Sequence, residues 1–229
     1  MSLQGFKDFP FAHTLTQRFI DLFPANNISE YDCPLLTGCR DVLKSDGTTE
    51  LIFFKAGYNT DTIQRVKHEH DILTQLQHYD FIPKILYTQD IGRYHILFLK
   101  HINGVSLDHI SYNDERWHKG ISNALDIMHK LYSECGFVHK DMHPNNIIID
   151  IDGKVHLIDF EFSYLSPNRI PDTSWVNDLG IFVNSLDNFD QDLIDKLEAF
   201  DEELSLIFGS MDPILYQAKI TKFKQILFS

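Results

Sequence analysis

The pattern of hydrophobic and polar residues changes near Gly104. Before this point, residues 35–57 and 85–104 each contain short apolar runs separated by turn residues, which predicts two pairs of antiparallel strands. Between the pairs, residues 61–79 repeat apolar side chains at a helical period. The first part of the chain is therefore expected to form an antiparallel sheet accompanied by one helix.

After Gly104 the helical period dominates. Residues 113–136 place apolar side chains about one helical turn apart and end in Gly136, a residue favoured just beyond a helix C-terminus. Two short strands are predicted next, in residues 146–150 and 155–160. Further helices are predicted over residues 174–186, 192–208 and 212–228.

The composition limits the kind of protein. Of the 229 residues, 43% are hydrophobic, which is enough for a folded core, and no apolar run approaches the roughly 20 residues that span a membrane. The net charge of −13 argues against nucleic-acid partners, because phosphates are bound by clustered Lys and Arg. The cysteines are scattered, and the N-terminal residues do not resemble a signal peptide. We therefore expect a soluble, cytoplasmic protein.

A carboxylate interrupts the apolar face of the helix predicted over residues 61–79. Glu69 falls on the same stripe as Val66 and Leu73. Either it lies at the edge of the stripe and reaches water, or it is buried with a cation, because an unpaired buried carboxylate is costly. Lys55 is the candidate partner, since it follows an apolar strand that is expected to be buried and itself needs a counter-charge.

The densest group of candidate catalytic residues lies in the two short strands and the loop before them. Asp141 is expected on an exposed loop, and Asn146 and Asp159 at the ends of strands. Such oxygen ligands suit Mg²⁺, and phosphoryl transfer needs little beyond a metal, a cation on the phosphates and a carboxylate at the acceptor hydroxyl. The alternative is a transition-metal site that uses His139 and His143, but no third nitrogen or sulfur ligand accompanies them.

These residues resemble the signature set of the protein-kinase-like superfamily. The matching positions are Lys55, Glu69, His139-Lys140-Asp141, Asn146 and Asp159-Phe160-Glu161. The resemblance covers residues 35 to 186, most of the chain. It implies an α+β bilobal fold, with an antiparallel-sheet N-terminal lobe that carries one key helix, a helical C-terminal lobe and a shortened activation segment.

The resemblance also implies domain boundaries. Residues 1–99 would form the N-terminal lobe, residues 100–104 the hinge and residues 105–229 the C-terminal lobe. Gly38 stands where kinases carry a glycine-rich loop over the phosphates of ATP. The hinge residues expected to hold the adenine are Lys100, His101 and Ile102.

Individual roles follow from the same resemblance. Lys55 would hold the α- and β-phosphates of ATP while paired with Glu69. Asp141 would be the catalytic base. Asn146 and Asp159 would bind Mg²⁺, or Mn²⁺ in its place.

Two residues would support the catalytic loop without taking part in the chemistry. His139 would pack beneath the loop and form a hydrogen bond with backbone near Asp159. Asp178, in the helix predicted over residues 174–186, would anchor the loop from below.

Departures from the usual kinase pattern bear on the acceptor. His143 stands two positions after Asp141, where Ser/Thr protein kinases usually place Lys, and Glu161 replaces a common Gly. The interval from Asp159 to Asp178 is too short for the long activation loop that serves as a peptide platform. These features resemble aminoglycoside phosphotransferases, choline kinases and kinases of the lipopolysaccharide inner-core sugar Kdo. We therefore expect ATP-dependent transfer to a hydroxyl of a small molecule, a sugar or a glycolipid.

Two alternatives remain open. RIO-type atypical protein kinases also lack the long activation loop and act on serine, so a protein acceptor is the first. A binding-only pseudokinase is the second, because the region around Gly38 is poor in glycine. With a glycolipid acceptor, Lys219, Lys222 and Lys224 would provide peripheral contact with a membrane, although a solvated helix face is the simpler explanation of these lysines.

Overall fold

The computed structural model describes residues 35–43, 48–111 and 113–166, together with the isolated positions Asp195, Ala218, Thr221, Lys222, Lys224 and Gln225. The chain divides into two compact units, Met1–Gln77 with Pro83–His101 and His78–Ile82 with Ile102–Ser229. Each unit has its own sheet and its own long helix.

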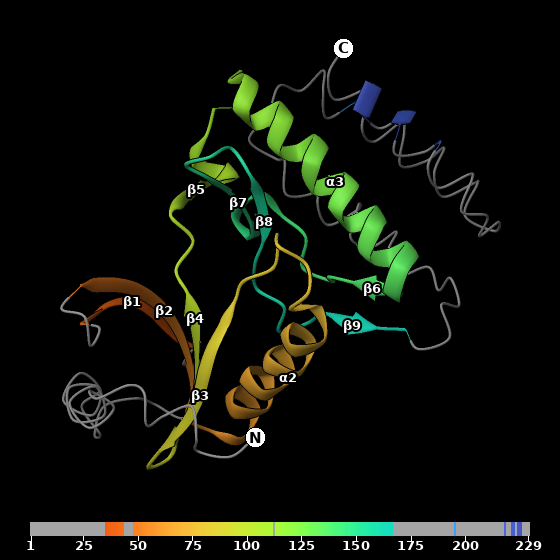
Figure 1. The fold of residues 1–229 in the computed structure, drawn as a ribbon. Coiled ribbons are helices and arrows are strands. Elements are labelled where there is room, and N and C mark those ends of the chain that lie inside the picture. Colours follow the sequence, from red (N-terminus) through yellow and green to blue (C-terminus); the bar gives the residue numbers. More distant parts are fainter. Residues whose placement is uncertain are drawn as a thin grey trace. The chain divides into compact units, whose positions relative to one another are not determined.

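The first unit contains a four-stranded antiparallel sheet (Figure 1). Its strands are β1 (Leu36–Leu43), β2 (Thr49–Gly57), β3 (Ile85–Ile91) and β4 (Tyr94–Lys100), in the spatial order β1-β2-β4-β3. Both strand pairs predicted from the sequence are confirmed, since β1 pairs with β2 and β3 pairs with β4. The contact between β2 and β4 joins the two pairs into one sheet.

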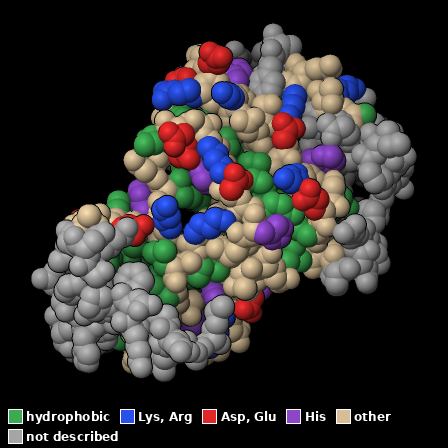
Figure 2. All heavy atoms as spheres, viewed as in Figure 1, with side chains coloured by type: hydrophobic (Ala, Val, Ile, Leu, Met, Phe, Trp, Pro, Cys, Tyr) green, Lys and Arg blue, Asp and Glu red, His purple; other side chains and the backbone are tan. Residues whose placement is uncertain are grey.

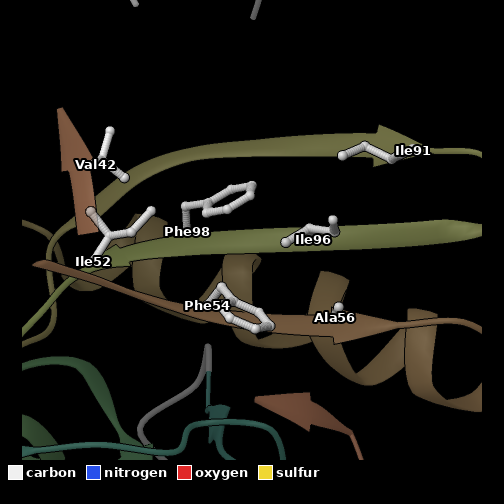
Figure 3. Close-up of a cluster of buried hydrophobic side chains, with 7 residues drawn as sticks. All are labelled: Val42, Ile52, Phe54, Ala56, Ile91, Ile96 and Phe98. Atoms are coloured by element: carbon white, nitrogen blue, oxygen red, sulfur yellow. The ribbon is translucent and has the colours of Figure 1, made fainter. Parts of the chain in front are cut away.

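One face of this sheet carries an apolar cluster, which Figure 3 shows in close-up. Strand residues alternate between the two faces, so Phe54 and its neighbours two positions away lie in the cluster while Lys55 lies on the opposite face. Tyr87 stacks on Phe98, with ring centroids 4.3 Å apart. The buried members of the cluster are Val42, Ile52, Phe54, Ala56, Ile91, Ile96 and Phe98.

Helix α2 (Thr60–Leu76) covers the other face, where it packs against β2 and β4 (Figure 1). It begins after Asn59, whose side-chain oxygen accepts a hydrogen bond from the Thr62 backbone N–H at 2.9 Å. The Thr62 hydroxyl accepts in return from the Asn59 N–H, which completes a capping box. The predicted stripe of Val66, Glu69 and Leu73 is among the residues that α2 buries, which are Thr62, Val66, Glu69, Ile72, Leu73 and Leu76.

The second unit is built on helix α3 (Glu115–Cys135). Asp114 caps its N-terminus, and Gly136 ends it with a left-handed φ of 66°, as the sequence predicts. An alanine Cβ at Gly136 would lie 2.7 Å from the Ser166 carbonyl oxygen, so the position also requires close approach of backbone. The residues that α3 buries are Trp117, Gly120, Ile121, Ala124, Leu125, Met128 and Leu131.

Two small antiparallel sheets accompany α3 (Figure 1). The first has the order β5-β7-β8, and the second pairs β6 with β9. Two short 3₁₀ helices, η2 and η3, lie between these strands in the chain. The bounds are β5 (Gly104–Ser106), η2 (Leu107–His109), β6 (Phe137–Val138), η3 (Pro144–Asn146), β7 (Ile147–Asp150), β8 (Val155–Leu157) and β9 (Tyr164–Leu165).

A short segment after α2, His78–Ile82, belongs to the second unit. The Tyr79 hydroxyl donates to Glu134 on α3 at 2.6 Å, and Lys130 of α3 lies over the Tyr79 ring. Asp80 pairs with Lys154 at 2.6 Å. These contacts attach the segment to α3 and to the β7–β8 turn, although the resemblance places it in the N-terminal lobe.

This architecture is the predicted α+β fold, with an antiparallel sheet and one key helix in its N-terminal part. Among the described residues, no helix is both long and apolar enough to cross a membrane. Several predicted features lie outside the described residues: the helices over 174–186, 192–208 and 212–228 apart from isolated positions, Asp178 with the end of the short activation segment, and Lys219.

Candidate active site

A buried ion pair joins the sheet and the helix of the first unit. Lys55 Nζ lies 3.0 Å from Oε1 and 2.8 Å from Oε2 of Glu69. The two side chains are only 6% and 1% exposed, so the interaction is protected from water and salt. The ion pair inferred from the sequence is confirmed, and the interpretation that Glu69 reaches water is wrong.

Gly38 lies inside strand β1 rather than in a loop, which corrects its expected placement. It faces Phe54 across the β1–β2 pair, and a side-chain Cβ at this position would lie 3.1 Å from the Phe54 ring. The glycine therefore makes room for a buried aromatic ring. Its role in holding phosphates stays a prediction.

The predicted hinge contains the boundary between the two compact units, which falls between His101 and Ile102. Lys100 is the last residue of β4, and its backbone N–H donates to the Lys84 carbonyl at 2.8 Å. That N–H is therefore engaged within the first unit. The contacts of Lys100, His101 and Ile102 with adenine stay a prediction.

His139 lies at the start of the predicted catalytic loop, which runs from β6 to β7. Its side chain is fully buried beside the rings of Phe137 and Phe160, and its Nε2 lies 2.9 Å from the Ile158 carbonyl oxygen. Burial lowers the pKa of His139 to about 4, so the ring is neutral at pH 7 and its Nε2–H donates to that carbonyl. The predicted structural role beside Asp159 is confirmed.

Two residues of this region hold left-handed backbone conformations that side-chain-bearing residues seldom adopt. Lys140 and Asp159 both have a φ of 66°. Lys140 Nζ lies 4.5 Å from the centroid of the Tyr164 ring, so the turn is held by a contact with β9. Strained backbone of this kind is concentrated at functional sites, because surrounding packing must maintain it.

Asp141 is held by its neighbours on the loop. The Asn146 amide nitrogen donates to the Asp141 backbone carbonyl at 2.8 Å and lies 3.2 Å from the Asp141 carboxylate. His143 Nε2 lies 3.2 Å from the same amide nitrogen and 3.5 Å from the carboxylate. The Asp141 side chain is 32% exposed, so it is positioned by the loop while one side remains open to an incoming group.

The paired strands β7 and β8 bring the two predicted metal ligands together. Ile147 is opposite Leu157, and the Ile158 N–H donates to the Asn146 carbonyl at 3.0 Å. Asn146 is buried, whereas Asp159 follows the strand end. Because the Asn146 amide nitrogen is turned toward Asp141, its amide oxygen points the other way.

This donor set fits Mg²⁺ better than a transition metal. An amide oxygen and a carboxylate are hard oxygen ligands, and such a site takes its remaining ligands from water and substrate phosphates. In the part of the chain that the structure describes, no three His, Cys, Asp or Glu side chains form a group able to hold a metal by themselves. His139, the first member of the alternative site, is committed to the Ile158 carbonyl.

The comparison with protein families is decisive at this point. Residues 50–166, just over half of the chain, match the RIO domain. The chain belongs to the RIO domain family. The matched residues include Lys55, Glu69, Asp141, Asn146 and Asp159, so the family match spans the geometry described above.

Curated relatives of the RIO chain are protein kinases. A probable serine/threonine-protein kinase of Dictyostelium discoideum is 26% identical over 46% of the chain and 8% of the relative. An Aurora kinase of Saccharomyces cerevisiae is 30% identical over 45% of the chain and 29% of the relative. A serine/threonine-protein kinase of Arabidopsis thaliana is 32% identical over 42% of the chain and 21% of the relative. The chain thus spans less than a third of each of these relatives.

By family, the RIO chain belongs to the protein-kinase-like superfamily. The names of these relatives agree with the alternative of a protein acceptor and give no support to a small-molecule, sugar or glycolipid acceptor.

Some features of the site were missed from the sequence. The contact of His143 with Asn146 joins residues three positions apart in a loop, where no periodicity predicts which side chains meet. Ser163, fully buried, donates from its hydroxyl to the His139 carbonyl at 3.1 Å. A serine that directly follows Phe162 was the available signal, and it is a weak one.

Proposed function

We propose that the RIO chain transfers the γ-phosphoryl group of ATP to the hydroxyl of a serine or threonine in a protein. The observation that supports this proposal is the position of Asp141. Its carboxylate is partly exposed, on a strained loop, and it is held by the Asn146 amide. A carboxylate in such a place is suited to orient an acceptor hydroxyl and to take its proton.

In the proposed step, one bond to the γ-phosphorus forms and another breaks. The acceptor oxygen forms a bond to the γ-phosphorus while its proton passes to the Asp141 carboxylate. The bond between the γ-phosphorus and the bridging oxygen breaks, and ADP leaves with that oxygen. Negative charge develops on that bridging oxygen as the bond breaks. Lys55, held in place by Glu69 at 2.8–3.0 Å, would contact the α- and β-phosphates and stabilise this charge.

The proposed metal ligands are Asn146 and Asp159. Mg²⁺, when bound there, supplies charge neutralisation for the β- and γ-phosphates. The amide geometry supports this assignment, since hydrogen bonding to Asp141 fixes the direction of the Asn146 oxygen. His139 supports the loop from below and keeps Ile158, the residue before Asp159, at a constant position.

The choice of a protein acceptor rests on the matched relatives, which are protein kinases. The features that resemble small-molecule kinases, His143 and Glu161, lie in and just beyond the catalytic loop. A small-molecule acceptor is therefore included in the test as a competing outcome.

The test measures transfer of labelled γ-phosphate by the purified chain with MgCl₂. The acceptors are dephosphorylated casein, an aminoglycoside, choline and a Kdo-containing core oligosaccharide, with the chain alone as the autophosphorylation control. We expect label on serine or threonine of protein, shown by phosphoamino-acid analysis.

The matched variants are Asp141→Asn and Lys67→Glu, the second altering an exposed residue of α2 in the first unit. Asp141→Asn should abolish transfer and spare ATP binding, because it removes only the group that orients the acceptor. Lys67→Glu should transfer at the unaltered rate. Label confined to a small molecule would refute the protein acceptor, and full turnover by Asp141→Asn would refute the mechanism.

A further inference from the structure

A groove of about 280 Å³ lies in the second unit, between the first turns of α3 and the β5-β7-β8 sheet. None of Asp141, Asn146 and Asp159 lines it, so it is not part of the site described above. Its lining residues are Gly104, Val105, Ile110, Arg116, Lys119, Gly120, Ile149, Asp150, Ile151 and Gly153.

Exposed aliphatic side chains converge on this groove. Val105 on β5 is 48% exposed, and Ile151 just after β7 is 76% exposed. They are two of the four large hydrophobic residues that are exposed in the described part of the chain. An apolar surface that opens to solvent in this way is typical of a binding site.

Glycine shapes the floor of the groove. Gly120 lets α3 approach β7, since a Cβ there would lie 2.7 Å from Ile149 Cδ1 and 2.7 Å from Leu107 Cδ2. The aliphatic floor is therefore closely packed below and open above. A groove of this volume has room for about two aliphatic side chains.

The rim of the groove carries positive charge that the fold does not use. Arg116 is engaged with Asp114, at 2.6 Å. Lys119 is exposed, and among the residues that the structure describes its side chain takes part in no hydrogen bond or ion pair. On the face seen in Figure 2, basic, acidic and apolar side chains are interspersed.

The acidic residue of the groove, Asp150, is committed to its own turn. Its carboxylate accepts from the Asp152 and Lys154 N–H groups, and it lies 2.9 Å from His156 Nε2. The uncommitted charge at the groove is thus the ammonium of Lys119, which locally favours a carboxylate on the partner.

We propose that this groove binds an extended acidic and aliphatic segment of the protein that the kinase phosphorylates, an inference that rests on the proposed function. Aliphatic side chains of the segment fill the groove beside Val105 and Ile151, and a carboxylate pairs with Lys119. An extended segment fits because β5 is an edge strand of its sheet among the described strands. Side chains two positions apart on such a segment point to the same face.

The test uses the full chain without nucleotide and the fluorescein-labelled peptide Asp-Asp-Leu-Ala-Leu-Asp-Asp, followed by fluorescence anisotropy. A second peptide replaces every Asp with Lys, and a third replaces both Leu with Ser. We expect the chain to bind the first peptide about tenfold more tightly than either of the others, because each of these lacks the charge or the aliphatic contact.

The variants change one contribution at a time. Ile151→Ser removes the aliphatic contact, with Leu51→Ser at another exposed strand position as its control. Lys119→Glu reverses the charge, with Lys67→Glu as its control. Both groove variants should bind the acidic peptide about tenfold more weakly, and both controls should bind it as the unaltered chain does. Lys119→Glu should gain affinity for the basic peptide, a gain that a misfolded variant does not show.

The peptide-binding and kinase measurements test the groove and the proposed function separately. Binding that none of the groove variants alters, or no binding of the acidic peptide by the unaltered chain, overturns the groove assignment whatever the kinase assay shows. Groove binding without label on any protein leaves the peptide site standing and refutes the protein-kinase function. With both intact, fusing the acidic peptide to casein should lower its KM about tenfold with kcat unchanged, and Ile151→Ser should cancel that gain.

Discussion

Replacing Glu69 with leucine should strongly destabilise the first unit. The leucine fills a similar volume but leaves the Lys55 ammonium buried without its carboxylate, in a place where the side chain is 6% exposed. At 2.8–3.0 Å and an effective dielectric constant near 20, the lost attraction is about 6 kcal/mol. Removing one partner of a buried pair costs about 3–5 kcal/mol, and we expect a loss in this range for Glu69→Leu.

The double variant Lys55→Met with Glu69→Leu distinguishes a lost partner from a lost contact. Both charges are then absent, and buried pairs replaced by apolar residues of similar size are often neutral or stabilising. We expect the double variant to lie within about 2 kcal/mol of the unaltered chain. The free energy of unfolding is measured by urea titration with far-UV circular dichroism and linear extrapolation.

An exposed ion pair on the same helix provides the control. Arg65 and Asp61 lie 2.9 Å apart, with side chains 41% and 68% exposed. Asp61→Ala should cost at most about 1 kcal/mol, because water screens that pair. A loss of unfolding free energy for Glu69→Leu no larger than that for Asp61→Ala would refute a strong buried ion pair. Additive losses for the Lys55 and Glu69 replacements in the double variant would refute it as well.

Three further predictions concern the metal, the buried histidine and the helix end. Asp159→Ala should weaken Mg²⁺-dependent ATP binding by about tenfold or more, because a charged oxygen ligand is lost; a titration like that of the unaltered chain would rule out the ligand role. Because the pKa of His139 is lowered to about 4 in the fold, the unfolded chain binds an extra proton between about pH 6.5 and pH 4. Stability should therefore fall by about 3 kcal/mol as the pH falls through that window. His139→Gln should lose that part of the pH dependence in urea titrations, and an identical pH profile would contradict a neutral buried imidazole. Gly136→Ala should cost more than Gly92→Ala, by about 1–2 kcal/mol. Both glycines have a positive φ, but only at Gly136 does a Cβ meet backbone, at 2.7 Å. Equal thermal shifts would show that the contact with Ser166 relaxes.

The local elements of this protein follow from its sequence. Apolar spacing predicted α2 and α3, because a helix that packs on one side must repeat apolar side chains about every turn. Strand pairs and the Gly136 helix end were predicted for the same kind of reason, since turns and caps depend on neighbouring residues. The kinase-like loop followed from a resemblance to a known family, carried by Lys55 and Glu69 together with Asp141, Asn146 and Asp159.

The pairing of distant residues was harder to predict. Lys55 and Glu69 were matched only because each was costly to bury alone, an argument about free energy rather than position. Gly38 was misplaced, because a glycine in a strand and a glycine in a loop look alike until Phe54 is seen across the sheet. The acceptor expected from His143 and Glu161 is not supported by the matched relatives, because residues of a loop do not by themselves show which molecule the loop meets.

The tertiary structure alone decided which groups share a surface. Asp141 meets Asn146 and His143 through loop backbone that has no period, and Lys119 comes to lie beside Ile151 only because α3 packs against β7. The sequence by itself determined the elements and the chemistry that each can carry, since those depend on neighbours along the chain. Packing determined which of these groups act together, because such contacts join residues that are remote in sequence.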